Sequence, residues 1–346
     1  MTDSILLKEI QEQPDVVKKL FATENKKVAE IVKSVRGSFE YILIAARGSS
    51  DNAARYAQYL FGTHNQLPVA LATPSLFTIY RQAPHLNGAL VIGISQSGQS
   101  PDIVQVISEA RKQNRPTISI TNAADSPLAR ASDHVIEMHA GVENATAASK
   151  TYMASLTALA MLSAHFIGGA EYLSQIQQLP EKISETIANI NTQVDKVDRY
   201  RYMEHCAVIG RGLNYATAFE IALKIKELTR IVAEPYSSAD FRHGPIAMVR
   251  EGFPVMVISP TGEVSGDVKE LVVELLRRKS ELLMISDDQQ LLNRAHLAFP
   301  ISSGIPEWLS PLIAILPGQI FAYYLARAKG LDPDHPQGIQ KVTETF

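Results

Sequence analysis

The sequence has little of what marks secreted, membrane-spanning or nucleic-acid-binding proteins. Its single cysteine, Cys206, excludes an intramolecular disulfide and a cysteine-based zinc site and favours a reducing compartment. The 33 basic and 36 acidic residues give a net charge of −3, without the basic excess typical of a nucleic-acid-binding domain. The longest apolar run, residues 311–326, is shorter than the roughly 18 residues of a membrane span and contains Pro317.

The remaining composition is that of a globular protein. Apolar residues make up 46% and charged residues 20% of the 346 positions, a length that predicts two domains. Residues 1–13 include Asp3, Glu9 and Glu12, and so lack the basic and then apolar pattern of a secretory signal. We therefore expect a cytoplasmic protein with no membrane or nucleic-acid partner.

A repeated order of strand, polar turn and helix runs along the chain. Short, mostly apolar runs are typical of strands buried on both faces of a parallel sheet. These runs are residues 41–46, 89–94, 117–120 and 134–138, and then 206–209, 254–259, 282–285 and 296–299. The alternation predicts an α/β fold, in which parallel sheets are flanked by helices in three layers.

The two groups of strands form an internal repeat. Gly48 and Gly212 follow equivalent strands and are 164 positions apart, as are Ser95 and Ser259. Three strand ends share nearly one offset, because Thr121 also matches a serine 165 positions later. Two copies of one domain are therefore predicted.

The helical periodicity completes the expected organisation. Helices are predicted for residues 5–33, with a break at Pro14, for the almost unbroken stretch 144–196, and for residues 216–230. Gly168, Gly169 and Pro180 punctuate the long stretch. We expect N-terminal helices in residues 1–36, a first domain at 37–196, a second domain at 197–332 and a C-terminal tail at 333–346.

A hydroxyl-rich turn is the strongest local motif. It reads Ser95-Gln96-Ser97-Gly98-Gln99-Ser100, directly after a strand and before a helix. Hydroxyl donors, free backbone N–H groups and the helix dipole together suit a phosphate, whereas a helix cap needs one serine only. Ser49 and Ser50, at the end of the neighbouring strand, are candidates to complete the site. The equivalent turn of the second copy has Pro260 and Glu263, so phosphate binding is assigned to the first copy.

Two other motifs are incomplete. Residues 93–97 approach the nucleophile elbow of hydrolases, but Ser97 replaces the final glycine that permits the strained turn. Gly210 and Gly212 begin a dinucleotide fingerprint, yet Tyr215 stands at the third glycine position. Neither activity is expected.

The second copy supplies ionisable groups. Lys224 and Glu227 lie three apart on a predicted helix and share a face, which most often gives a solvated surface pair. His243 is fixed by a following Gly-Pro, and histidine is the residue type best suited to proton transfer near neutrality. The tail carries one lysine, Lys341. No histidine pair has metal-ligand spacing, so we expect no metal and no cofactor.

On these residues the chain resembles the double sugar-isomerase (SIS) domain family, in particular the isomerase half of glucosamine-6-phosphate synthases and stand-alone glucosamine-6-phosphate deaminases. The matching motifs include Ser95 to Gly98, Lys224 to Glu227, His243 to Pro245 and the terminal lysine. Across nearly the whole chain their spacing is similar to that of the family.

The resemblance implies roles for individual residues. Glu227 would move the proton between C1 and C2, Lys224 would lie beside it, His243 would open the sugar ring from the neighbouring subunit of a homodimer, and Lys341 would contact or form a Schiff base with the C2 carbonyl. The sugar phosphate would be held by Ser50, Ser95, Gln96, Ser97 and Ser100. Further substrate contacts would come from Gly48, Ser49, Thr146, Ala148 and Ser149. Ala148 departs from the family, which usually has serine there.

The expected direction of the reaction depends on the N-terminal cysteine nucleophile of the synthases. The synthases begin with a glutaminase domain whose first residue is a cysteine, whereas this sequence begins Met1, Thr2, Asp3. We expect isomerising deamination, in which glucosamine 6-phosphate and water give fructose 6-phosphate and ammonia. The alternatives are a fructosamine-6-phosphate deglycase, an aldose–ketose isomerase, or a non-catalytic sugar-phosphate-binding regulatory module.

Overall fold

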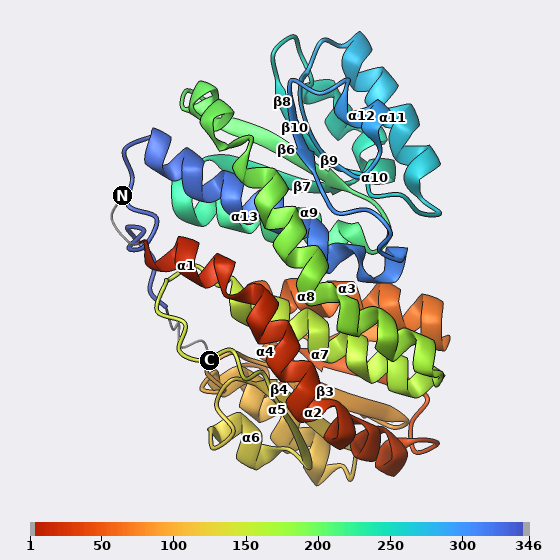
Figure 1. Cartoon of the computed structure of the whole chain (residues 1–346). Helices are drawn as coiled ribbons and strands as arrows, with labels where there is room; N and C mark the ends of the chain where they lie inside the picture. Colours follow the sequence, from red (N-terminus) through yellow and green to blue (C-terminus); the bar gives the residue numbers. More distant parts are fainter. Residues whose placement is uncertain (1–3, 342–346) are drawn as a thin grey trace. The chain divides into compact units, whose positions relative to one another are not determined.

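The computed structural model describes residues 4–341, which form two compact units built from interleaved segments (Figure 1). The N-sheet unit comprises residues 15–143, 150–178 and 340–341. The C-sheet unit comprises residues 4–14, 144–149 and 179–339. Each unit contains one of the two expected sheets, and the domain boundaries drawn at residues 36, 196 and 332 stay a prediction.

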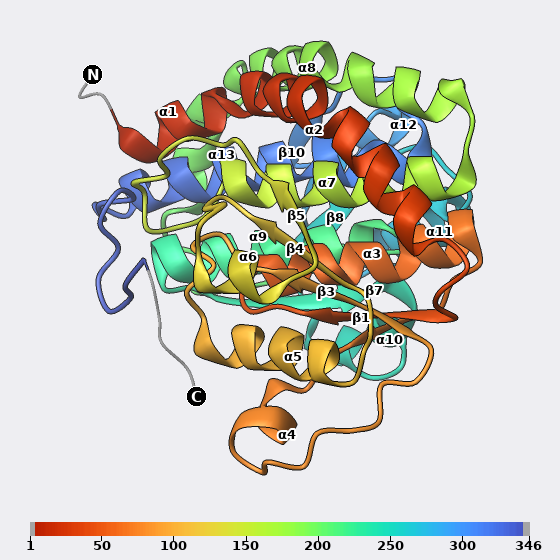
Figure 2. The ribbon, with the colours of Figure 1, turned by 90° about the horizontal axis from the view of Figure 1, so that it is seen from below.

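The N-sheet unit is built on five parallel strands in the order β2-β1-β3-β4-β5. The strands are β1 (Tyr41–Ala45), β2 (Val69–Leu71), β3 (Ala89–Ile94), β4 (Thr117–Thr121) and β5 (His134–Glu137). The helices are α2 (Gln13–Val35), α3 (Ser49–Asn65), α4 (Pro74–Thr78), α5 (Pro101–Lys112), α6 (Pro127–Ala131) and α7 (Lys150–Ile167). In Figure 2, α5 and α7 lie on opposite sides of β1 and β3. Strand β3 is apolar throughout because both of its faces are covered.

The C-sheet unit has a second parallel sheet, in the order β10-β9-β8-β6-β7. Its strands are β6 (His205–Gly210), β7 (Val232–Ser237), β8 (Pro254–Ile258), β9 (Glu281–Ser286) and β10 (Leu297–Pro300). Its helices include α1 (Ile5–Gln11), α9 (Asn214–Thr229), α10 (Ser238–Arg242), α11 (Ser265–Arg277), α12 (Gln289–Leu292) and α13 (Ser310–Ala328). Figure 1 shows α9 and α13 on one face of this sheet and α11 and α12 on the other.

The two sheets have one topology. Counted from its other end, the second sheet runs β7-β6-β8-β9-β10, which matches β2-β1-β3-β4-β5 strand for strand. The predicted α/β class and the predicted internal repeat are both confirmed.

Some local expectations were wrong. Residues 144–149 are irregular, and the long helical stretch is instead α7 followed by α8 (Ala170–Asn191) and a 3-10 helix, Val194–Tyr200. Helix α8 continues through Pro180 because its neighbours Leu179 and Ile183 are fully buried, so packing outweighs the lost hydrogen bond. The edge strands β2 and β7 were not predicted, since both are partly exposed and lack a continuous apolar run.

The apolar helix near the C-terminus is a core element. Residues 307–328 are long and apolar enough to cross a membrane, but 94% of the apolar window is buried inside the fold, which is typical of a core helix in a soluble protein. A Cβ atom on Gly318 of α13 would lie 2.2 Å from Cγ1 of Ile221 on α9. Glycine therefore permits the close approach that fixes α9, the helix of Lys224 and Glu227.

Candidate functional site

The hydroxyl-rich turns of the N-sheet unit meet at one edge of the sheet. Strands β1 and β3 are adjacent and parallel, with Ala45 opposite Gly93, so the turns after them leave the sheet together. Arg47 Nε donates to the buried Asp102 Oδ2 at 2.8 Å and ties the first turn to the helix that follows the second. The structure thus brings the turn of Gly48, Ser49 and Ser50 beside residues 95–100.

The turn at residues 95–100 has the shape of an anion cradle. The Gly98 amide donates to Ser95 Oγ at 3.2 Å, and Gly98 adopts a φ of +63°. A Cβ atom there would lie 2.1 Å from Ser126 Oγ, so only glycine fits. Ser100 is the N-cap of α5 and makes no side-chain capping hydrogen bond. Pro101 has no N–H and the Ile103 amide donates to Asp102 Oδ1 at 2.9 Å, so the turn offers a ligand mainly its hydroxyl groups.

The equivalent turn of the C-sheet unit is already occupied by carboxylates. Asp287 Oδ1 accepts from the amide of Thr261 at 2.7 Å, and Glu307 Oε2 accepts from the amide of Glu263 at 2.8 Å. Phosphate would meet two negative charges where the first copy offers hydroxyl groups. This arrangement gives a physical reason for assigning phosphate binding to the first copy alone.

A buried cluster of charges lies on α9. Lys224 Nζ is 2.5 Å from Glu227 Oε2 and 3.4 Å from Glu220 Oε1. The side chains of Lys224 and Glu220 are 3% and 0% exposed, whereas that of Glu227 is 22% exposed. The pair is therefore not the solvated surface pair that its spacing most often gives. The Lys224 ammonium lies between two carboxylates, and of these Glu227 is the one that a ligand can reach.

A cavity of about 200 Å³ adjoins Glu227. Its opposite wall is the segment after α13, which includes Asp332, His335 and Gln337. Arg230, the residue directly after α9, donates to Gln337 Oε1 at 2.6 Å and holds this segment against the helix. Glu227 is thus the carboxylate of the α9 cluster that lines a cavity.

His243 lies at the surface of its unit, directly after α10. Its amide donates to Asp240 O at 3.1 Å, and its side chain is exposed. Gly244, the next residue, has a φ of +144°, a conformation that side chains rarely adopt. An exposed histidine on a fixed turn can reach a ligand that is bound elsewhere.

Lys341 is held by a carboxylate that the sequence did not reveal. Its Nζ is 2.7 Å from Glu143 Oε2, and the side chain of Glu143 is fully buried. Glu143 also accepts from the hydroxyl of Thr151 at 2.8 Å and from its amide at 3.1 Å. The only sequence signal for Glu143 was its place just before the motif that ends in Ser149 and Lys150.

The irregular segment 144–149 belongs to the C-sheet unit and is fastened to α1. Buried Glu9 accepts from the amide of Asn144 at 2.5 Å and from that of Ala145 at 3.3 Å. Thr146 and Ala148 are partly exposed, whereas Ser149 is fully buried. Of the three expected substrate contacts here, Thr146 and Ala148 have accessible side chains.

The chain is similar to known proteins over almost all of its length. The family model for the SIS domain matches residues 40–164 and again residues 201–328. A glutamine–fructose-6-phosphate aminotransferase (isomerizing) of Aquifex aeolicus (strain VF5) is 33% identical over 344 residues, which cover 97% of this chain and 57% of the relative. The chain therefore spans about half the length of the curated relatives that it matches.

Solved structures share the architecture. The C-terminal domain of glucosamine-fructose-6-phosphate aminotransferase from Francisella tularensis superposes with a TM-score of 0.85 at 27% identity, covering 96% of this chain and 98% of that domain. A glucosamine-6-phosphate deaminase from Thermotoga maritima has a TM-score of 0.82 at 24% identity, covering 99% of this chain and all of that one, a likeness of fold alone.

Proposed function

Because the chain belongs to the SIS domain family and carries two SIS domains in tandem, we propose that it interconverts the aldose and ketose forms of an amino-sugar phosphate. The proposed reaction converts glucosamine 6-phosphate and water into fructose 6-phosphate and ammonia. Relatives about one-third identical are named for fructose 6-phosphate, which supports the substrate class.

The phosphate is assigned to the anion cradle. Hydroxyl and amide groups of Ser50, Ser95, Gln96, Ser97 and Ser100 would hold it, with α5 supplying the positive end of its dipole. Binding energy gained at the phosphate would serve to orient the reacting carbons.

The buried α9 cluster is the single observation that carries the proposal. In the opened sugar, the Glu227 carboxylate takes the proton from C2 and returns it to C1, which converts the amino aldehyde into a C2 ketimine. Lys224 holds the position and charge of Glu227 throughout. Lys341 would displace ammonia by forming its own imine at C2, and water would then release the ketose. General acid–base groups of this kind contribute about 10²- to 10⁴-fold each.

The chain's one thiol is unsuited to release ammonia from glutamine. Cys206 is buried in β6, and burial raises the pKa of its thiol to about 12, so it carries almost no thiolate near neutrality. This thiol therefore does not supply ammonia at the site, and we propose that the site exchanges ammonia with solution.

The exposed His243 supports a shared site. We assign ring opening to this imidazole, contributed to the neighbouring subunit of a homodimer in the cytoplasm. In a single chain the side chain is accessible, as such a contribution requires.

The test is to incubate the purified protein with glucosamine 6-phosphate and to measure ammonia and fructose 6-phosphate by separate assays. Equal amounts of the two products are expected. Ammonia-free isomerisation of a plain hexose phosphate would favour an aldose–ketose isomerase, and amine release from a fructosamine 6-phosphate alone would favour a deglycase. Binding without turnover of any of the three would reject an enzyme in favour of a regulatory module.

A further inference from the structure

Helix α10 is a single short turn that ends directly before His243, and one carboxylate holds it at both ends. Ser238, its first residue, donates its hydroxyl to Asp267 Oδ2. Arg242, its last residue, donates from Nη1 to Asp267 Oδ1 at 2.7 Å and from Nη2 to the Asp267 backbone carbonyl at 2.8 Å. Five residues cannot form a stable helix alone, so these contacts and the burial of Phe241 must define it.

Asp267 is charged in this arrangement. Burial of the carboxyl opposes ionisation, but the hydrogen bonds from Ser238 and Arg242 outweigh it and lower the pKa of Asp267 below its ordinary value. Arg211 Nε, at the end of β6, lies 3.8 Å from the same carboxylate. Helix α10 and the end of β6 therefore both contact this one side chain of α11.

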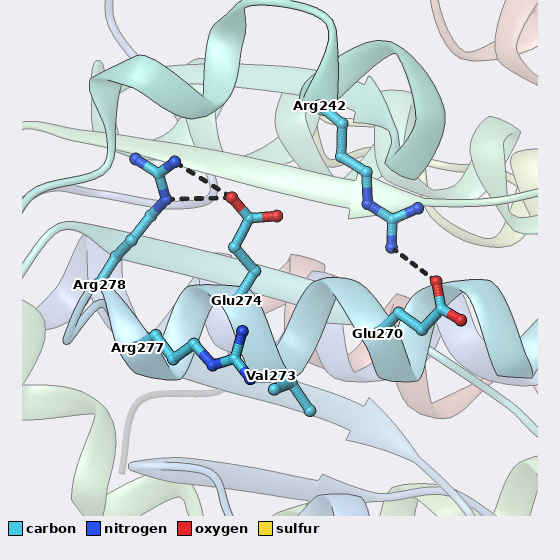
Figure 3. A pocket seen from close by; sticks show the side chains of 6 residues that line it. All are labelled: Arg242, Glu270, Val273, Glu274, Arg277 and Arg278. Carbon is cyan, nitrogen blue, oxygen red and sulfur yellow. Dashed lines mark hydrogen bonds and ion pairs between the residues drawn. The ribbon is translucent and has the colours of Figure 1, made fainter.

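Arg242 has a second acidic neighbour, Glu270 (Figure 3). Both side chains line a surface pocket of about 630 Å³. Glu270 Oε2 lies 3.9 Å from Arg242 Nη2, but the Glu270 side chain is 80% exposed. A long, solvated contact of this kind contributes little. Asp267, and not Glu270, therefore determines where Arg242 lies.

Comparison of the two copies shows which contacts of Asp267 occur in both and which occur only beside His243. In the first copy, Arg47 follows β1 and pairs with Asp102 in the first turn of α5 at 2.8 Å. Arg211 and Asp267 occupy the same places after β6 and in the first turn of α11. The arginine–aspartate tie thus belongs to both copies, whereas the contacts to Ser238 and Arg242 occur in the copy that carries His243.

We propose that Asp267 is a positioning residue for His243, because it clamps both ends of α10 and so fixes the turn from which the imidazole projects. This inference rests on the proposed role of His243 in ring opening. A displacement of about 1 Å at a reacting group can cost up to 100-fold in rate, so loosening the turn should reduce turnover without weakening phosphate binding.

The test compares Asp267→Asn with Glu270→Gln, a matched loss of one charge on the same helix. For Asp267→Asn we expect kcat on glucosamine 6-phosphate to fall about 10-fold while KM stays within about twofold. In a His243→Gln background the same change should have no further effect, because residues that act as one unit are not additive. Glu270→Gln should match the wild-type protein.

Amide hydrogen exchange gives a readout that needs no substrate. Peptides covering residues 238–243 should exchange faster in Asp267→Asn and unchanged in Glu270→Gln. Unchanged exchange, a wild-type kcat or an additive effect in the double variant would each overturn the inference. If Asp267→Asn does not fold, Arg242→Gln removes the same clamp from the other side. A wild-type protein without turnover would reject the proposed function alone, since the exchange measurement would still decide whether Asp267 holds α10.

Discussion

Glu227 and Lys224 show how burial can set a common pair of charges apart from a solvated surface pair. The ammonium is almost fully removed from water between two carboxylates, and only Glu227 keeps an accessible part. Glu227 is therefore the member of the cluster that a substrate can reach.

Replacing Glu227 by Gln should abolish proton transfer and leave the phosphate site intact. We expect kcat to fall at least about 100-fold, because the amide retains the shape of the side chain but cannot act as a base. Measurement of C2 deuterium exchange in D2O would follow the affected step directly. Glu234→Gln, a change at an exposed carboxylate of β7, is the matched control and should be silent. Retained exchange in Glu227→Gln would assign the base elsewhere.

Glu143→Gln tests the carboxylate that holds Lys341. Loss of the negative charge removes the 2.7 Å ion pair and lets the lysine leave its place, so we expect kcat to fall about 10-fold. In a Lys341→Ala background the change should add no loss of rate. An equal loss in both backgrounds, measured by steady-state kinetics, would show that Glu143 acts independently of Lys341.

Sequence reasoning reached the residues of short motifs and missed those that act through distant partners. The turn of residues 95–100 could be recognised because its hydroxyl groups lie within six residues, and its phosphate-binding role stays a prediction. Glu143 could not be recognised, since its partner Lys341 is 198 positions away. Asp267 was missed for a similar reason: its contacts with Ser238 and Arg242 exist only once α10 and α11 are packed.

At the level of elements, α9 is positioned by one close contact with α13. Gly318→Ala would place a methyl group 2.2 Å from the Ile221 side chain. Overpacking of this kind costs about 1–3 kcal/mol of unfolding free energy. Urea denaturation should show that loss, and kcat should fall with it because α9 carries Lys224 and Glu227.

Gly62→Ala is the contrasting control for the same substitution. Gly62 is exposed within α3, and an added Cβ atom meets nothing within 4 Å. Helix propensity predicts a gain in stability of up to about 1 kcal/mol. A loss of stability in both variants, or in neither, would contradict the packing role of Gly318.

Elements buried on both faces were predictable, and elements at the edges were not. Strand β3 is entirely apolar and buried, whereas β2 has three residues of mixed exposure at the edge of its sheet. Periodicity reports burial, so it identifies central strands first. The continuation of α8 through Pro180 could not be predicted either, because it depends on the tertiary packing of buried side chains.

For the whole molecule, the shared site predicts complementation. Glu227→Gln and His243→Gln should each retain only a small residual activity alone. After the two purified proteins are unfolded together and refolded, mixed dimers should regain activity, because one of the two sites in each mixed dimer has both groups intact. Activity that stays at the level of the parents, with mixed dimers verified by native mass spectrometry, would place His243 in the site of its own chain.

The two copies of the repeat differ in the turn that is predicted to bind phosphate. Both copies have one topology, but the first has a hydroxyl-rich turn where the second has amides bound to Asp287 and Glu307. The repeat could be predicted from strand-end offsets. The carboxylates that close the second turn could not, because Glu307 is 44 positions from Glu263, the residue whose amide it accepts from.

Helix α1 has a consequence for how the chain is made. Ser4 and the amides of Ile5 and Leu6 bond to Asp334, which follows them by about 330 positions. During synthesis at about 5–20 residues per second, α1 waits on the order of tens of seconds for this partner. Leu6 and Ile10, buried in the finished fold, stay exposed in the nascent chain for that time. Helix α1 leaves the ribosome before the rest of this fold and is one of its last elements to be placed, so its apolar side is the natural target for a chaperone.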